Sequence, residues 1–165
     1  MWVLATDIDN TLTGDEAALR DLAPQLDMLR RREQLFLILA TGRRLAHVLS
    51  GFVDEALPQG DAIVTQVGTE IYLPPYSAGM APLAAWQEQL QQHFSRSRAL
   101  AFLDGIEGLE MQPAIYNTAL KVSVFLHRAP YPHAAASEIR QRIAASDDGE
   151  HYHVVWSSGC LLYTS

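Results

Sequence analysis

Short apolar runs alternate with amphipathic stretches along the first seventy residues. Leucines recur at spacings of three and four between residues 15 and 31, a pattern typical of a helix that packs one face on a core. Apolar runs too short for a helix predict strands buried in a parallel sheet. The expected strands are 2–8, 35–40 and 61–67, and the expected helices are 15–31 and a stretch after Arg43 to about Leu57. This alternation predicts an α/β fold with a doubly wound parallel sheet.

The pattern changes after Gly68. A short strand expected at 70–73 is ended by Pro74-Pro75. Beyond it the pattern predicts helices at 83–94 and 134–145 and strands at 109–112, 121–126 and 152–156. We therefore expect three segments: residues 1–75 as the N-terminal part of the core, residues 76–153 as an inserted α/β module, and residues 154–165 as the return to the core.

Composition and net charge limit the kinds of partner that the chain could bind. The chain has 165 residues, of which 48% are hydrophobic, enough for one domain with a small insert. Its net charge of −7 gives no bulk attraction to nucleic acid or to an anionic membrane, so a phosphate site must be built locally. The single cysteine excludes an internal disulfide in this sequence, and the N-terminus has no basic flank typical of a signal peptide. We expect a cytoplasmic protein.

Two carboxylates follow the first apolar run, in the string DIDNTLTG at residues 7–14. Asp7 and Asp9 are two residues apart, so on a strand they share one side, and the C-terminal end of a strand is where α/β sheets bind ligands. Apolar neighbours would leave the pair poorly solvated, so it calls for a cation such as Mg²⁺, which prefers oxygen ligands and substrate phosphate. The pattern favours phosphoryl transfer, with Asp7 attacking phosphorus and Asp9 acting first as acid and then as base.

The backbone of this segment offers further ligands. The carbonyl of Ile8 points away from its neighbours, so the Asp9 carbonyl is the better candidate for a second metal ligand. The N–H groups of residues 10–12 would face phosphate oxygens as the chain turns. The alternative is a helix cap or a solvated turn, because Asp-Asn-Thr is a common capping composition. The full string directly after an apolar run favours a functional role.

These residues resemble motif I of the haloacid dehalogenase superfamily, in which the first aspartate is the nucleophile and the second the acid/base. Thr41, in LATGR at residues 39–43, resembles motif II, a Ser/Thr that holds a phosphate oxygen. An ordinary helix cap is the alternative for Thr41. The resemblance implies Mg²⁺ bound by Asp7 and Asp9. It also implies phosphate contacts from Asn10, Thr11, Thr41 and Gly42.

The position of the insert resembles the α/β-capped subclass IIB of this superfamily, whose members mostly act on phosphorylated sugars. VGTEIY at 67–72 is similar to a segment of sucrose-phosphate phosphatases, LKVS at 120–123 resembles their cap segment, and VWSSG at 155–159 resembles the strand that returns to the core. The resemblance implies that Lys121 contacts the sugar. An edge-strand lysine that blocks sheet pairing is the alternative.

Two departures from the family pattern bear on function. The family usually shows a Glu-Gln-x-Pro-like stretch before the cap lysine, where this chain has YNTA at 116–119. After the return strand the family continues with a Lys-Gly motif and a Gly-Asp-x-x-Asn-Asp motif, whereas this sequence ends at Ser165. We therefore expect an incomplete core and an incomplete, C-terminally truncated chain.

Three functions are compatible with these observations. The leading one is a Mg²⁺-dependent phosphatase that hydrolyses a sugar phosphate, with an association with a sugar-phosphate synthase. A second is a sibling phosphatase acting on a glycosyl-glycerate or hexose phosphate. The third, from a different class, is a non-catalytic fragment that binds a sugar or a partner enzyme.

Overall fold

The computed structural model describes residues 1–126, 130–157 and 160–164, and it divides into two compact units, Met1–Trp86 and Gln87–Ser165. The first unit contains β1 (Trp2–Asp7), α1 (Glu16–Arg31), β2 (Leu35–Ala40), α2 (Leu45–Asp54), β3 (Ala62–Thr65), the 3-10 turn η1 (Gln66–Gly68) and β4 (Glu70–Tyr72). Helix α3 (Ala84–Gln91) crosses the boundary between the units. In the described part of the chain, no helix combines the length and the apolar character needed to cross a membrane.

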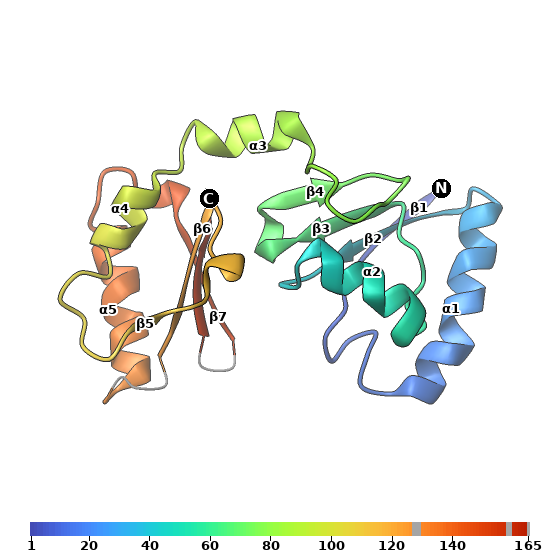
Figure 1. Cartoon of the computed structure of the whole chain (residues 1–165), viewed down its shortest axis with the longest axis horizontal. Helices are drawn as coiled ribbons and strands as arrows, with labels where there is room; N and C mark the ends of the chain where they lie inside the picture. The colour runs from blue at the N-terminus through green and yellow to red at the C-terminus, as the bar shows by residue number, and fades with distance from the viewer. Residues whose placement is uncertain (127–129, 158–159, 165) are drawn as a thin grey trace. The chain divides into compact units, whose positions relative to one another are not determined.

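The first unit is a four-stranded sheet in the order β1-β2-β3-β4, with two helices packed on it (Figure 1). β1, β2 and β3 run parallel and β4 runs antiparallel to β3. In this register Asp7 lies beside Ala40, and Ala40 lies beside Val64. The C-terminal ends of β1 and β2 therefore meet at the same end of the sheet. The expected α/β class with a parallel sheet is confirmed.

One apolar cluster holds this unit together. Leu35, Leu37 and Leu39 alternate along β2 as its buried positions. They pack with Leu19 and Leu26 of α1 and with residues of α2 in a single cluster. Each such side chain, fully buried, contributes roughly 1.5–3 kcal/mol. α1 begins where Asp15 accepts N–H bonds from Ala17 and Ala18, both at 3.0 Å, which satisfies two donors of its first turn.

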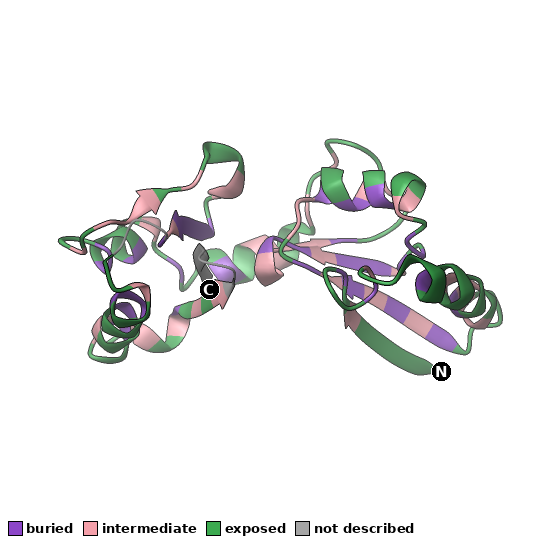
Figure 2. Ribbon diagram, turned by 90° about the horizontal axis from the view of Figure 1, so that it is seen from below, coloured by how far each residue is buried: buried purple, intermediate pink, exposed green. Residues whose placement is uncertain are grey.

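β1 differs from the expectation. The apolar run predicted a buried strand, but Trp2 is 81% exposed and Val3 is 64% exposed. The strand that follows the N-terminus is coloured as exposed in Figure 2. β1 is the edge strand of its sheet and pairs only with β2 in the part of the chain described. Burial begins at Ile8, which is fully covered. The expected burial of β1 is therefore wrong for this structure.

The second unit is a four-stranded sheet in the order β5-β6-β8-β7, and every neighbouring pair is antiparallel. Its strands are β5 (Glu110–Met111), β6 (Lys121–Phe125), β7 (His153–Ser157) and β8 (Cys160–Thr164). Helices α4 (Arg96–Ala101) and α5 (Pro132–Ala144) lie on one side of this sheet (Figure 1). Short 3-10 turns occupy Ala114–Tyr116 (η2) and Gly149–His151 (η3). The buried positions of β6 and α5, among them Val122, Val124, Ile139 and Ile143, form its apolar interior.

The division between the units falls after Trp86, whereas we expected the insert to begin at Tyr76. The hydroxyl of Tyr76 donates to the carbonyl of Gly60 at 3.0 Å. The indole N–H of Trp86 donates to the carbonyl of Gly68 at 2.9 Å. These bonds tie residues 76–86 to the first unit.

The last two strands also differ from the expectation. Residues 154–165 were expected to return to the core, but β7 pairs with β8, and β8 pairs with β6. These strands therefore belong to the sheet of the second unit. The pairing supplies their backbone hydrogen bonds within that sheet, which explains the difference.

Candidate active site

The chain turns sharply around Ile8 at the end of β1. The Ile8 carbonyl accepts the N–H of Leu12 at 3.0 Å, and it accepts both the N–H and the hydroxyl of Thr13, at 2.9 and 3.0 Å. Asn10 takes a left-handed backbone with φ of 58°, which asparagine tolerates better than most residues. The Ile8 carbonyl is thus directed into the turn. This supports the Asp9 carbonyl as the better candidate for a metal ligand.

The same turn changes the expected phosphate contacts. The N–H groups of Thr11 and Leu12 donate to the Ile8 carbonyl at 3.3 and 3.0 Å, so in this structure neither points freely toward a ligand. Their contact with phosphate would require these bonds to be exchanged, and it stays a prediction. Asn10 and Thr11 are exposed, and contact of their side chains with phosphate stays a prediction.

Thr41 lies at the end of β2, beside the end of β1. It is 6% exposed, and its N–H donates to the carbonyl of Val64 at 2.9 Å. Its Oγ1 accepts the N–H of Arg43 at 3.1 Å and lies 3.5 Å from Oδ2 of Asp9. The N-cap residue of α2 is Arg44, so the interpretation of Thr41 as the cap of this helix is wrong. The structure brings Thr41 and Asp9 together, with Gly42 exposed next to them.

Arg43 is a further site residue, which the sequence reasoning missed. Its guanidinium donates to Oδ1 of Asp9 from Nε and Nη2, at 3.0 and 2.7 Å. It also donates to Glu55 from Nη1 and Nη2, at 2.6 and 2.9 Å. The hydrogen bonds from Glu55, and then those from Asp9, raise the pKa of Arg43, so it stays charged. Its place directly after Thr41-Gly42 was the one available indication, whereas nothing in the sequence marks Glu55.

The solvation of the carboxylates also differs from the expectation. Asp7 is exposed and the Asp9 side chain is 50% exposed, because the edge strand β1 leaves this end of the sheet open. Desolvation therefore does not create the need for a cation here. The guanidinium of Arg43 already supplies one positive charge beside Asp9.

The oxygen atoms around Asp7 and Asp9 meet only part of what a Mg²⁺ site needs. Among the described residues no group of three or more His, Cys, Asp or Glu side chains could hold a metal ion. Mg²⁺ is commonly bound through one or two carboxylates, with substrate phosphate and water completing its shell. The Asp7 carboxylate and the Asp9 carbonyl fit that lesser requirement. The Asp9 carboxylate is engaged by Arg43 and Thr41 in this structure.

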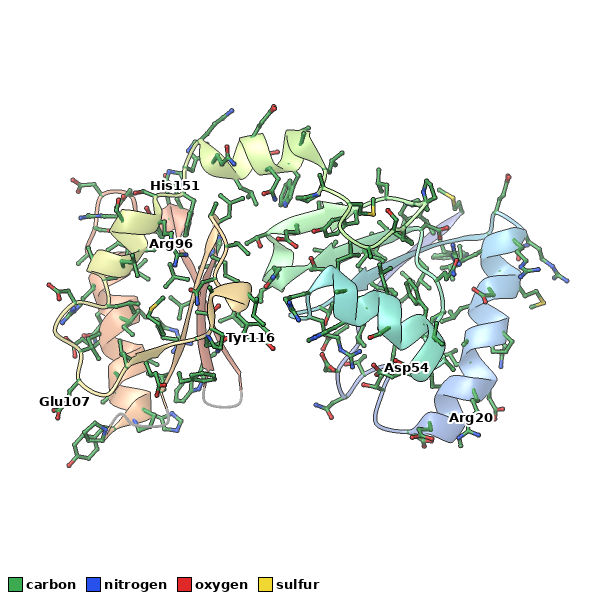
Figure 3. The ribbon with its side chains drawn as sticks, viewed as in Figure 1. Arg20, Asp54, Arg96, Glu107, Tyr116 and His151 are labelled. Atoms are coloured by element: carbon green, nitrogen blue, oxygen red, sulfur yellow. The ribbon has the colours of Figure 1, made fainter. Side chains whose placement is uncertain are left out.

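A surface hollow lies next to this ion-pair network in the first unit. It extends from the loop after β1 to the end of α2, and Figure 3 labels two of its residues, Arg20 and Asp54. The lining residues are Thr13, Gly14, Glu16, Leu19, Arg20, Asp54, Glu55 and Ala56. Glu55 therefore lines the hollow and also accepts hydrogen bonds from Arg43, which pairs with Asp9.

Lys121 is neither exposed nor on an edge strand. It begins β6, which lies between β5 and β8, and it is 2% exposed. The edge-strand interpretation is therefore wrong. Arg96 (labelled in Figure 3) donates to the carbonyls of Thr118 and Lys121 at 2.8 and 2.7 Å, which braces the loop before this strand. A contact between Lys121 and a sugar stays a prediction.

The parallel sheet, with an aspartate pair at one strand end and a threonine at the next, is the arrangement of the haloacid dehalogenase superfamily. Among solved structures, the chain is similar to the sucrose-phosphatase from Synechocystis sp. PCC6803 in complex with sucrose and phosphate, with a TM-score of 0.77 and 26% identity over 99% of this chain and 63% of that one. It shares its fold with a sugar phosphatase of subclass IIB, with a TM-score of 0.56 at 16% identity, over 100% of this chain and 70% of the other.

The sequence comparison identifies the family. A model of the sucrose-6F-phosphate phosphohydrolase family matches residues 1–162, and the chain belongs to that family. A curated relative, the mannosylfructose-phosphate phosphatase of Agrobacterium fabrum, is 30% identical over 145 residues, which are 88% of this chain and 56% of that protein. The chain therefore spans little more than half the length of this curated relative.

Proposed function

We propose that the protein carrying this chain is a Mg²⁺-dependent phosphatase that hydrolyses a sugar phosphate through an aspartyl-phosphate on Asp7. The observation that carries the proposal is the convergence of Thr41 with Asp9 where β1 and β2 end, 3.5 Å apart in a chain of this family. Both the sucrose-phosphatase and the mannosylfructose-phosphate phosphatase support the substrate class, because each is named for a phosphorylated sugar.

The chemistry takes two steps. A carboxylate oxygen of Asp7 bonds to phosphorus as the bond from phosphorus to the sugar oxygen breaks, and Asp9 gives that oxygen its proton. In the second step Asp9 takes a proton from water, whose oxygen bonds to phosphorus and releases the Asp7 carboxylate. The hydroxyl of Thr41 holds a phosphate oxygen in both steps. The Asp7 carboxylate and the Asp9 carbonyl would hold Mg²⁺, which would supply positive charge to offset that of the phosphoryl group.

The substrate is proposed as a class. Disaccharide phosphates are the first compounds to test, since both named relatives act on such sugars by their names. Hexose phosphates and glycosyl-glycerate phosphates come next, because residues 116–119 depart from the family pattern before Lys121. Association with a sugar-phosphate synthase and a cytoplasmic location stay predictions.

The decisive experiment replaces Asp7. The whole protein carrying these residues is assayed for Mg²⁺-dependent phosphate release from a panel of these sugar phosphates. Asp7→Asn should abolish release, whereas Asp15→Asn should retain it, because asparagine caps a helix as well as aspartate does. Turnover of Asp7→Asn within a few-fold of the parent would exclude Asp7 as the nucleophile.

The non-catalytic alternative predicts a different result from the same panel. A protein that only binds a sugar would show saturable binding of the free sugar and no phosphate release with any compound. Calorimetric titration of the same sugars, run beside the assay, distinguishes the two functions.

A further inference from the structure

The ion-pair network around Arg43 joins three residues that are far apart in the sequence. Asp9 follows β1, Arg43 lies in the turn after β2, and Glu55 caps the end of α2. The Arg43 side chain is 17% exposed, less than the 50% of Asp9 and the 35% of Glu55. The guanidinium is thus the covered centre of the network, with one carboxylate on each side.

This geometry restricts the side chain of Asp9. An aspartate that is half exposed on a turn would otherwise sample several rotamers. Here Nε and Nη2 of Arg43 donate to its carboxylate from one side, and Oγ1 of Thr41 lies 3.5 Å from Oδ2. A planar guanidinium fixes both the position and the plane of a carboxylate, which an ammonium group cannot do.

Glu55 in turn restricts Arg43. It accepts two bonds, from Nη1 to Oε1 and from Nη2 to Oε2. Its own N–H is bound to the carbonyl of Gly51 at 3.0 Å, so its backbone belongs to the last turn of α2. The end of the helix therefore anchors the guanidinium that holds Asp9.

We propose that Arg43 is a positioning residue for Asp9, which it holds in the orientation that proton transfer requires, and that Glu55 holds Arg43 in place. The inference rests on the proposed function, since it assigns Asp9 the transfer of protons to the leaving oxygen and from water. Arg43 acts through Asp9 and contributes to turnover only while Asp9 carries a carboxyl group.

A second ion pair in the same unit provides a matched control. Arg30 donates to Asp61 at 2.9 and 2.7 Å and to Asp27 at 3.2 Å, and its side chain is 18% exposed. It therefore matches Arg43 in burial and in having two carboxylate partners. Asp61 precedes β3 and binds the N–H of Leu37 near the start of β2, at the opposite end of the strands from Asp9.

The test is a double-mutant cycle on the whole protein carrying these residues. The variants are Arg43→Gln, Asp9→Asn and both together, and kcat and KM are measured for the best sugar phosphate. Arg43→Gln should lower kcat by about 10- to 100-fold and leave KM within about twofold, as expected for a misplaced acid/base group. In the Asp9→Asn background the same change should lower kcat by less than about twofold, since coupled residues are not additive.

Two further variants keep the result interpretable if Arg43→Gln folds poorly. Arg43→Lys keeps the charge but cannot form the fork, so it should recover only part of the lost kcat. Glu55→Gln should lower kcat less than Arg43→Gln and should also lose its effect in the Asp9→Asn background. Arg30→Gln should lower the melting temperature and leave kcat unchanged.

The outcomes distinguish the positioning role of Arg43 from the proposed phosphatase function on which it rests. A full Arg43→Gln penalty that persists in the Asp9→Asn background would overturn the positioning role, because Arg43 would then act on phosphate or on the fold. An unchanged kcat in Arg43→Gln would overturn it equally. No phosphate release from the unmutated protein would overturn the proposed function first, and the role of Arg43 with it.

Discussion

The N–H of Val67 donates a hydrogen bond to the carbonyl of Thr41 at 3.2 Å, and Val67 does so from a left-handed backbone with φ of 61°. Gln66 before it also has a left-handed φ, of 53°, and its N–H donates to the carbonyl of Arg43 at 3.1 Å. Such a backbone is rare for a β-branched residue and costs about 1–3 kcal/mol. The two bonds offset that cost and fasten the turn after β3 to the turn that carries Thr41.

The first prediction concerns Gly68, the third left-handed residue of this turn, with φ of 96°. A Cβ there would meet no atom within 4 Å, so Gly68→Ala tests the backbone alone. We expect it to lower the free energy of unfolding by about 1–2 kcal/mol, the cost of a left-handed alanine. Gly42→Ala is the control, because its backbone is not left-handed and its Cβ would lie 3.8 Å from Cγ2 of Val67, an ordinary contact. Urea unfolding of both variants measures the difference, and equal losses would contradict the explanation.

The order of the elements and the place of the motifs could be predicted from the sequence. Strand and helix periods are local, so the alternation in the first seventy residues gave the parallel sheet, and the apolar run before Asp7 gave a strand end. Thr41 was predicted to lie at the end of the next strand, and it does. Parallel pairing then brings Asp7 beside Ala40 and thus near Thr41.

Features that depend on distant partners could not be predicted in this way. An apolar run can form either a central strand or an edge strand, so the sequence did not indicate the exposure of Trp2. Glu55 ends a helix and carries no motif, and its bond to Arg43 exists only once α2 has packed on the sheet. Lys121 was placed on a strand, but its burial depends on the neighbours that β6 acquires.

The second prediction concerns the hydroxyl of Thr41. Thr41→Val keeps the shape of a buried side chain but removes the group that accepts the Arg43 N–H and lies on Oδ2 of Asp9. In the proposed mechanism the same hydroxyl holds a phosphate oxygen, and hydrogen bonds to charged groups are worth about 1.5–3 kcal/mol, so kcat/KM for the sugar phosphate should fall by roughly 10- to 100-fold. Thr41→Ser keeps the hydroxyl and should stay within about threefold of the parent. Steady-state kinetics of the two variants decide it, and a serine variant as slow as the valine one would show that the methyl group matters instead.

The third prediction concerns Asp9 as acid and base. Asp9→Asn should slow phosphate release by about 10²–10⁴-fold, the usual effect of losing general acid–base catalysis. Asp7→Asn should remove release altogether, so the two variants differ in residual rate. Asp21→Asn, on the exposed side of α1, is the control and should leave the rate unchanged. A turnover number of Asp9→Asn equal to that of the parent would exclude the assignment.

The last prediction concerns pH and the ion pair of Arg30 with Asp61. The Arg30 guanidinium binds both oxygens of Asp61, and the N–H of Leu37 donates to Oδ2 at 2.8 Å. These bonds, chiefly that from Arg30, hold the pKa of Asp61 below its usual value in the folded protein. The folded state therefore binds the proton less readily than the unfolded state does. The stabilisation is fully present above the unfolded pKa of about 3.9 and is lost as pH falls through the lowered folded pKa.

Asp61→Asn removes this titration while keeping an acceptor for the N–H of Leu37. At pH 7 we expect the free energy of unfolding of the variant to be about 1–2 kcal/mol below that of the parent, since Asp61 is only 27% exposed. The gap should narrow as pH falls below about 4, because the parent then loses the same interaction. The difference in unfolding free energy between Arg30→Gln and the parent should also narrow over this pH range, because this variant lacks the other partner of the ion pair. Urea unfolding at half-unit steps from pH 7 to pH 2.5 measures the gap. A gap that stays constant across this range would show that the charge on Asp61 contributes nothing to stability.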